Sequence, residues 1–189
     1  MIVPAPALIS RPYMPSVPSP IPEALRIMVE TAYAAALCYG FISDVRSLKI
    51  PNAVCLGVLA LFFLNYWLLT PQDGIAQHLI AGGAAFAVTF AIYAAGIMGA
   101  GDVKLISALM LWAGSRDGLA FLIVMTFIGG LMAGLLLILQ KAMALWPAAS
   151  RYIKPKRLKT WARLGIFPYG IAICAAGLIL MPSFFARPH

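Results

Sequence analysis

The sequence predicts an all-α, polytopic membrane protein with six transmembrane helices, both termini outside and a GxGD loop at the cytoplasmic face. Three observations predict this fold class: the composition, a succession of apolar runs, and an uneven distribution of basic residues. Of the 189 residues, 62% are hydrophobic and 11% are charged, against about 45–50% and about 25% in an ordinary soluble domain. A soluble protein of this size could not bury so much apolar surface. The composition therefore excludes a soluble enzyme, a nucleic-acid-binding module and a disordered chain.

The chain divides into two predicted tails and one membrane domain. The segment 1–23 is rich in proline and is predicted to be a flexible tail, because proline breaks helices. The membrane domain covers 24–182, and 183–189 forms the second tail. A transmembrane helix needs about 20 apolar residues to cross about 30 Å of hydrocarbon. The apolar runs that we assign as spans are about 24–43, 51–70, 75–97, 103–114, 118–140 and 166–182.

The basic residues orient this domain. Ten of the 14 Lys and Arg residues lie in or beside the connections 44–50, 98–102 and 141–165, and the other four lie on the opposite side. By the positive-inside rule, these three connections face the cytoplasm and both termini lie outside. The basic loop 141–165 also carries aromatic residues and is predicted to lie on the membrane surface, with a role in docking the substrate as the alternative. The fourth span, 103–114, is short, so it either tilts into its flanks or begins below the membrane surface.

Two of the six acidic residues are candidates for chemistry. Asp44 ends the first span and Asp102 follows the third, so the topology brings both to the cytoplasmic face at similar depth. Two carboxyls that close share one proton, so that one is neutral while the other is ionised. Peptide hydrolysis needs that state, because the carboxylate activates water while the acid polarises the carbonyl. No metal site is predicted, since His78 and His189 are badly placed for one.

Two glycines precede Asp102. Gly99 and Gly101 flank Ala100 and leave the backbone without side-chain bulk, which suits an extended substrate strand laid along this loop. Asp102 also opens the next helix, where a carboxylate caps free N–H groups, so a purely structural role stays open. The three cysteines lie in apolar stretches without a CxxC pair and are predicted to be small core residues.

Three motifs together resemble those of the type IV prepilin peptidases, aspartic proteases of the bacterial inner membrane in the GxGD class. The first is an aspartate with a downstream basic residue and Ile-Pro-Asn, the second is GxGDxK, and the third is a late Pro-Tyr-Gly. The supporting residues of these motifs are Arg46, Lys49, Pro51, Asn52, Pro168, Tyr169 and Gly170. The resemblance covers the chain from 24 to about 182.

The resemblance implies that Asp44 and Asp102 are the catalytic aspartates, and that Gly99, Gly101 and Lys104 belong to the loop motif. Family members remove the basic leader peptide from prepilin or pseudopilin precursors at the cytoplasmic membrane face, without a metal or another cofactor. Larger members also N-methylate the new amino terminus and carry paired CxxC motifs. Here seven residues link the first two spans and no CxxC is present. The chain therefore resembles the short, peptidase-only members that serve Flp/Tad-type pili, and N-methyltransferase activity is not expected.

Two other functions stay open. A proton-coupled membrane transporter could use the two aspartates as a relay, but it predicts carboxylates distributed across the membrane depth. Here only Glu30 lies deep. A non-catalytic subunit of a secretion or pilus machine predicts that neither carboxylate is essential. The expected partners are the lipid bilayer and, for a peptidase, the precursor proteins; nucleic acid is not expected.

Overall fold

The computed structural model describes residues 23–68, 74–145, 161 and 168–185, and these contain helices and no strand. The all-α part of the predicted fold class is therefore confirmed. The helices are α1 (Glu23–Ser47), α2 (Asn52–Leu68), α3 (Ile75–Ala94), α4 (Ala100–Leu145), α6 (Tyr169–Ile179) and α7 (Met181–Phe185).

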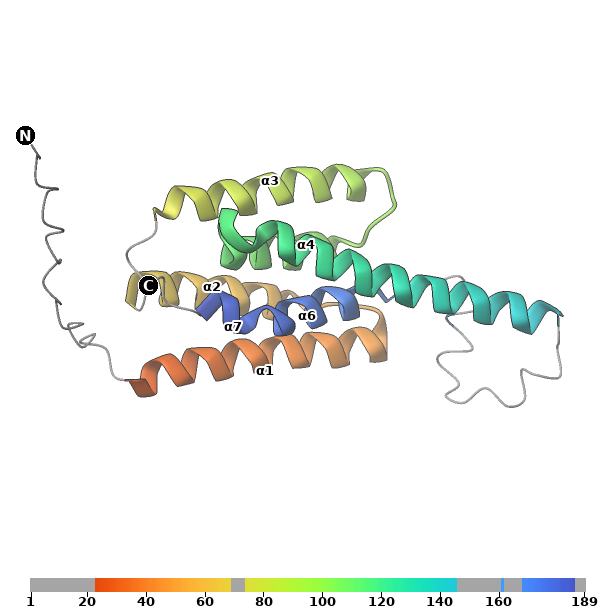
Figure 1. Ribbon diagram of the computed structural model, residues 1–189, viewed down its shortest axis with the longest axis horizontal. Helices are drawn as coiled ribbons and strands as arrows, with labels where there is room; N and C mark the ends of the chain where they lie inside the picture. The colour runs from red at the N-terminus through yellow and green to blue at the C-terminus, as the bar shows by residue number, and fades with distance from the viewer. Residues whose placement is uncertain (1–22, 69–73, 146–160, 162–167, 186–189) are drawn as a thin grey trace, which may run out of the picture.

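The helices form an elongated bundle around α4, which packs against α2, α3, α6 and α7 (Figure 1). α1 packs against α2 and α6 on the other side of the bundle. The end of α1 and the starts of α2, α4 and α6 lie at one end of the bundle (Figure 1). This arrangement brings short segments from distant parts of the sequence together at that end.

α4 contains a sharp break at Gly114. This residue has φ +59° and ψ −158°, in a region that favours glycine. The chain reverses there, so that Gly129, in the second half of α4, lies beside Tyr169 at the end of the bundle where α4 begins. The sequence predicts a connection at 115–117 between two spans; in the structure those residues are helical and the break lies just before them.

His78 of α3 stabilises this break. Its Nδ1 lies 2.7 Å from the carbonyl oxygen of Leu111, which in an unbroken helix would accept from the amide of Ser115. Because a carbonyl only accepts, Nδ1 carries the proton. A Cβ on Gly114 would lie 2.9 Å from the His78 ring, so a glycine is required by packing as well as by its dihedral angles.

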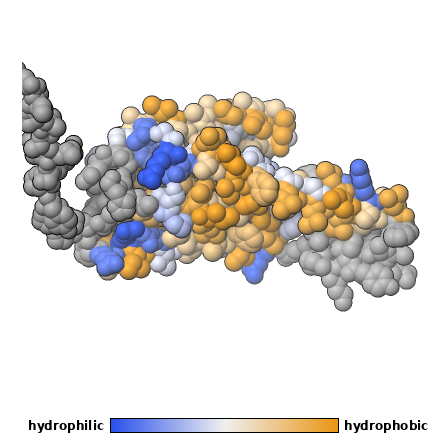
Figure 2. All heavy atoms as spheres, in the orientation of Figure 1, coloured by the Kyte–Doolittle hydropathy of each residue, from blue (hydrophilic) through white to orange (hydrophobic). Residues whose placement is uncertain are grey.

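Three helices, α1, α3 and α4, are long enough and apolar enough to cross a membrane, whereas the sequence predicts six spans. One reason for the difference is that α4 holds the fourth and fifth predicted spans in one element. Another is that α2 and α6 are apolar but have only 17 and 11 residues, fewer than the roughly 20 that a span needs. Hydrophobic residues cover much of the described face that Figure 2 shows, which fits contact with lipid tails.

Several predicted boundaries shift or fall outside the described residues. α4 runs on to Leu145, into the predicted basic loop, and α7 runs to Phe185, into the predicted second tail. Most of the Pro-rich tail and of the basic loop, together with 69–70, 166–167 and 186–189, lies outside the described part of the chain.

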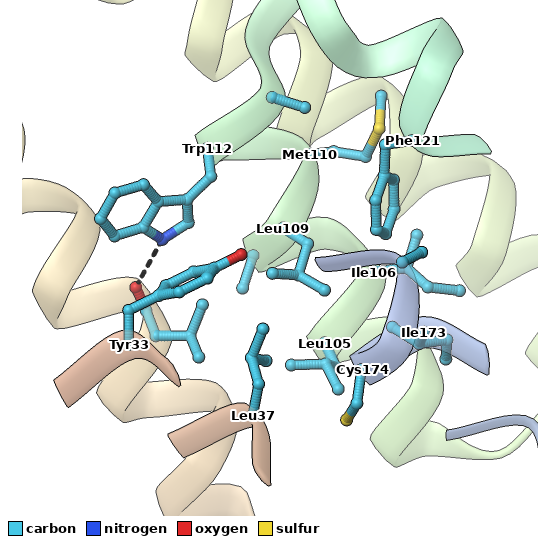
Figure 3. Close-up of a cluster of buried hydrophobic side chains, with 14 of the residues drawn as sticks. Tyr33, Leu37, Leu105, Ile106, Leu109, Met110, Trp112, Phe121, Ile173 and Cys174 are labelled. Atoms are coloured by element: carbon cyan, nitrogen blue, oxygen red, sulfur yellow. Dashed lines mark hydrogen bonds between the residues drawn. The ribbon is translucent and has the colours of Figure 1, made fainter. Parts of the chain in front are cut away.

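A buried cluster joins α1, α4 and α6 (Figure 3). The ring centroids of Tyr33 and Trp112 lie 4.9 Å apart. The Tyr33 hydroxyl donates to the Gly177 carbonyl at 3.2 Å, and the Trp112 indole N–H donates to the Val58 carbonyl at 3.0 Å. These bonds satisfy the polar atoms of two large side chains inside an apolar core. The cluster fixes how the helices that carry Asp44 and Asp102 sit relative to each other.

Candidate active site

A pocket of about 430 Å³ lies where α1 ends and where α4 and α6 begin. It is lined by both aspartates that the sequence singles out, by three residues of the α1–α2 connection, by the GxGD loop and by the start of α6. The lining residues are Asp44, Leu48, Lys49, Ile50, Gly99, Ala100, Gly101, Asp102, Pro168 and Tyr169. The structure thus brings together residues more than 120 positions apart in the sequence.

Asp44 is held by the first turn of α6. Its side chain is buried, and its Oδ2 accepts a hydrogen bond from the Ile171 N–H at 3.1 Å. Asp44 lies in the last turn of α1, where the helix dipole disfavours a negative charge, but the start of α6 supplies unpaired N–H groups that favour one. A Cβ on Gly170 would lie 2.8 Å from the Asp44 carboxyl carbon. The Pro-Tyr-Gly motif therefore starts a helix whose glycine leaves room for this carboxyl group.

Asp102 is held by its own loop. It lies in the first turn of α4 and is partly exposed. Its backbone N–H donates to the Gly99 carbonyl at 3.1 Å, and its carboxylate accepts from the Gly99 backbone. This reciprocal pair resembles a helix capping box. The capping role that the sequence left open is therefore present, and the same carboxyl group also lines the pocket and lies close enough to Asp44 for their charges to interact.

The connection between α1 and α2 closes one wall of the pocket. Leu48 has φ +55° and its N–H donates to the Asp44 carbonyl at 2.9 Å, which ends α1 in a tight turn. The turn places Ile50 against Gly101 and Gly170, with its side-chain atoms 3.1 and 2.9 Å from the positions where a Cβ would lie. Gly101 is thus needed for the close approach of Ile50. The sequence suggested a different reason, namely that the glycine leaves space for an extended substrate strand along this loop.

The other residues of the predicted motifs lie around this pocket. Lys49 lines it, and Pro168 is buried in its wall. Lys104 does not line it; its ammonium donates to the Asn52 side-chain oxygen at 3.0 Å and so ties the start of α4 to the start of α2. The remaining members are Arg46, exposed near the end of α1, and Pro51, which directly precedes α2.

Sequence reasoning missed two contributors, Ile50 as a pocket wall and Cys55. The Cys55 thiol is buried and lies 3.8 Å from the Gly101 carbonyl, to which it donates. Cys55 follows Asn52 by three residues and so shares its face of α2. That spacing was the only signal in the sequence that could have linked this cysteine to the loop. In the ranges that the structure describes, no three His, Cys, Asp or Glu side chains gather as metal ligands would.

One comparison with known proteins gave a match. A model of the type IV leader peptidase family matches residues 31–138, a range that contains both aspartates and the whole GxGD motif. Pro168, Tyr169 and Gly170 lie beyond the matched range. Searches of curated proteins and of solved structures gave no match. Because the family model covers more than half of the 189 residues, the chain belongs to the type IV leader peptidase family.

Proposed function

We propose that this protein is a membrane aspartic endopeptidase that removes the basic leader peptide from prepilin or pseudopilin precursors. The family acts on substrates of the prepilin type, and Asp44 and Asp102 are proposed as the catalytic pair. The single observation that carries the proposal is the pocket into which α1 and α4 each place one carboxyl group.

The contacts of the two carboxyls support different roles. Asp44 receives backbone hydrogen bonds from the start of α6, which stabilise a carboxylate. We assign it as the base that takes a proton from water as the water attacks the scissile carbonyl. Asp102, on a partly exposed loop, is assigned as the acid that donates a hydrogen bond to the carbonyl oxygen. The proton that Asp44 gains then passes to the leaving amine, and both carboxyls return to their starting states.

The same proposal includes a topology. Six crossings, with both termini outside, require the two halves of α4 to cross separately and α2 and α6 to cross with their flanking residues. The pocket then lies at the cytoplasmic face of the bacterial inner membrane. The basic residues near it, Arg46 and Lys49, support that orientation by the positive-inside rule. The division into a tail, a membrane domain over 24–182, a basic loop and a second tail belongs to the same proposal.

The short connection between α1 and α2 supports the peptidase-only form. Only residues 48–51 separate the two helices, and the first three of them line the pocket. This connection leaves no room for the inserted segment with paired CxxC motifs that larger members carry. We therefore expect no N-methyltransferase activity and a substrate of the Flp/Tad pilin kind.

The test uses membranes that contain this protein and a tagged prepilin, with leader removal followed as a gel shift. Asp44→Asn and Asp102→Asn are nearly isosteric and are each expected to slow cleavage by about 10²–10⁴-fold or more. Asp117→Asn, in α4 outside the pocket, is the matched control and is expected to cleave like the wild type. If both pocket variants still cleave normally, the catalytic assignment is wrong. A transporter or a non-catalytic subunit then becomes the better hypothesis.

A further inference from the structure

A second cavity, of about 550 Å³, lies beside the pocket and has the shape of a trough. α2 and α3 form its walls, because they pack on the first half of α4 rather than extensively on each other. Each of the three helices contributes residues at positions i, i+3, i+4 and i+7, which is one helix face. The lining residues are Asn52, Cys55, Leu56, Leu59, Leu79, Gly82, Gly83, Phe86, Lys104, Ser107, Ala108 and Leu111.

The trough is polar at one end and apolar along the rest of its length. The polar end is formed by the Lys104–Asn52 hydrogen bond, and Lys104 lies two residues after Asp102. Cys55 belongs to the trough and donates to Gly101 of the pocket, so the two cavities share a wall. From that end the trough runs along the bundle for about two helical turns, roughly 10 Å.

The apolar part is open to the surroundings of the bundle. Leu56 and Phe86 are 63% and 48% exposed, although both line the trough. Gly83 is exposed too, and a Cβ built on it would meet nothing within 4 Å. Small residues with open space above them allow another helix to approach closely in a membrane. The trough therefore has the shape and polarity of a groove for an apolar helix that begins at its polar end.

We infer that this trough binds the apolar helix of the substrate, directly after the bond that is cut. The inference rests on the proposed function, because a leader peptidase cuts between a basic leader and an apolar helix. With the leader in the pocket, the chain that follows has to leave past Gly101 and Asn52, where the trough begins. The shared wall, which places the polar end of the trough beside the pocket, is thus what selects this occupant over a lipid acyl chain.

The first test fills the trough. Gly83→Leu has space for its side chain and improves helix propensity, so it is expected to fold. For a tagged prepilin that the wild type processes, kcat/KM is expected to fall by at least about tenfold. For a short peptide with the leader and cleavage site but without the apolar helix, the rate is expected to stay unchanged. Gly130→Leu is the matched control, since Gly130 is also exposed, helical and without a neighbour within 4 Å of a Cβ.

Two results of this test would overturn the inference. Normal cleavage of the full prepilin by Gly83→Leu would show that the trough does not bind the substrate. Equal losses for the prepilin and the short peptide would show that the substitution acts on the pocket instead.

The second test needs no cleavage and therefore separates the inference from the proposed function. p-Benzoylphenylalanine is placed at Leu56, and at Ile123 as an exposed control outside the trough, in the Asp44→Asn protein. A cross-link to the prepilin from position 56 and not from 123 is expected. Cross-links to lipid alone from position 56 would overturn the inference. If the wild type cleaves no prepilin and position 56 still captures one, the proposed function fails while the binding site stands.

Discussion

The two ends of the bundle use glycine for opposite purposes. At the pocket end, Gly170 and Gly101 have ordinary helical conformations, and each makes room for a neighbour, the Asp44 carboxyl group or Ile50. At the far end, Gly114 adopts a left-handed φ that reverses α4, and His78 hydrogen-bonds the nearby carbonyl of Leu111. The first kind of glycine shapes a site, and the second kind shapes the fold.

This difference predicts which glycine substitutions lower the cleavage rate and which lower the stability of the fold. A methyl group added at the pocket end must move a carboxyl group or the pocket wall, and misplacement by about 1 Å can cost about 10²-fold in rate. The aromatic cluster around Tyr33 and Trp112 keeps the helices in place when that happens. A methyl group added at Gly114 instead disfavours the reversal, which brings Gly129 in the second half of α4 beside Tyr169 of α6.

Among substitutions outside the two aspartates, the largest effect is expected from Gly170→Ala. The added methyl group would lie 2.8 Å from the Asp44 carboxyl carbon and 2.9 Å from Ile50 Cδ1, so the carboxyl group must move. Prepilin cleavage is expected to fall by about 10²-fold or more, while the thermal midpoint in detergent changes little. Gly134→Ala, at a helical glycine with no neighbour within 4 Å of a Cβ, serves as the control. Normal cleavage by Gly170→Ala would show that the position of Asp44 is not critical.

Gly114→Ala is expected to have the opposite effect, a loss of stability with little loss of cleavage. Gly114 has φ +59° and ψ −158°, a region that essentially only glycine adopts and that costs another residue about 1–3 kcal/mol. The new methyl group would also lie 2.9 Å from the His78 ring. The thermal midpoint in detergent is expected to fall by several degrees, whereas cleavage per folded molecule stays within about twofold of the wild type. A variant that is stable but inactive would contradict the separation between the two ends.

The sequence predicted that Asp44 and Asp102 lie at the same end of the bundle, and the structure places both in one pocket. The number of spans was predicted less well, because only three helices are long enough and apolar enough to cross a membrane. Apolar runs mark where helices lie, and every described helix overlaps one of them. The break in α4 was misplaced because the Ser-Arg-Asp-Gly segment has the composition of a turn. A single left-handed Gly114 supplies the reversal, so those residues continue the helix.

The pocket residues that were missed are those whose roles depend on tertiary contacts. The sequence marks Ile50 only as the first residue of the Ile-Pro-Asn motif. Neither periodicity nor charge distinguishes Ile50 or Cys55 from lipid-facing neighbours. Asp44 was easier to find, because an acidic residue at the end of an apolar run is rare. That it is held by Ile171 depends on the fold of residues 127 positions away, which local patterns cannot encode.

A smaller effect on activity is expected from Gly99→Ala. Gly99 is exposed, and its added methyl group would lie 3.2 Å from the Asp102 Oδ2, with no other neighbour closer than 3.9 Å. Because the loop can give by a few tenths of an ångström, cleavage is expected to fall by about three- to tenfold. The ratio of the Gly170→Ala and Gly99→Ala rates measures how rigidly the two carboxyls are held. If Gly99→Ala proves as damaging as Gly170→Ala, the Asp102 loop is held as tightly as Asp44.

The smallest effect is expected from Cys55→Ala, which removes the hydrogen bond that the thiol donates to the Gly101 carbonyl. A thiol is a weak donor, and a typical bond contributes about 0.5–1.5 kcal/mol, so a loss of about two- to threefold in cleavage is expected. Cys55→Ser keeps a donor at this position and is expected to retain more activity than Cys55→Ala. Cys38, exposed on α1, is the matched control, and Cys38→Ala is expected to cleave normally. If the alanine and serine variants at position 55 lose the same activity, packing under the loop matters there and the hydrogen bond does not.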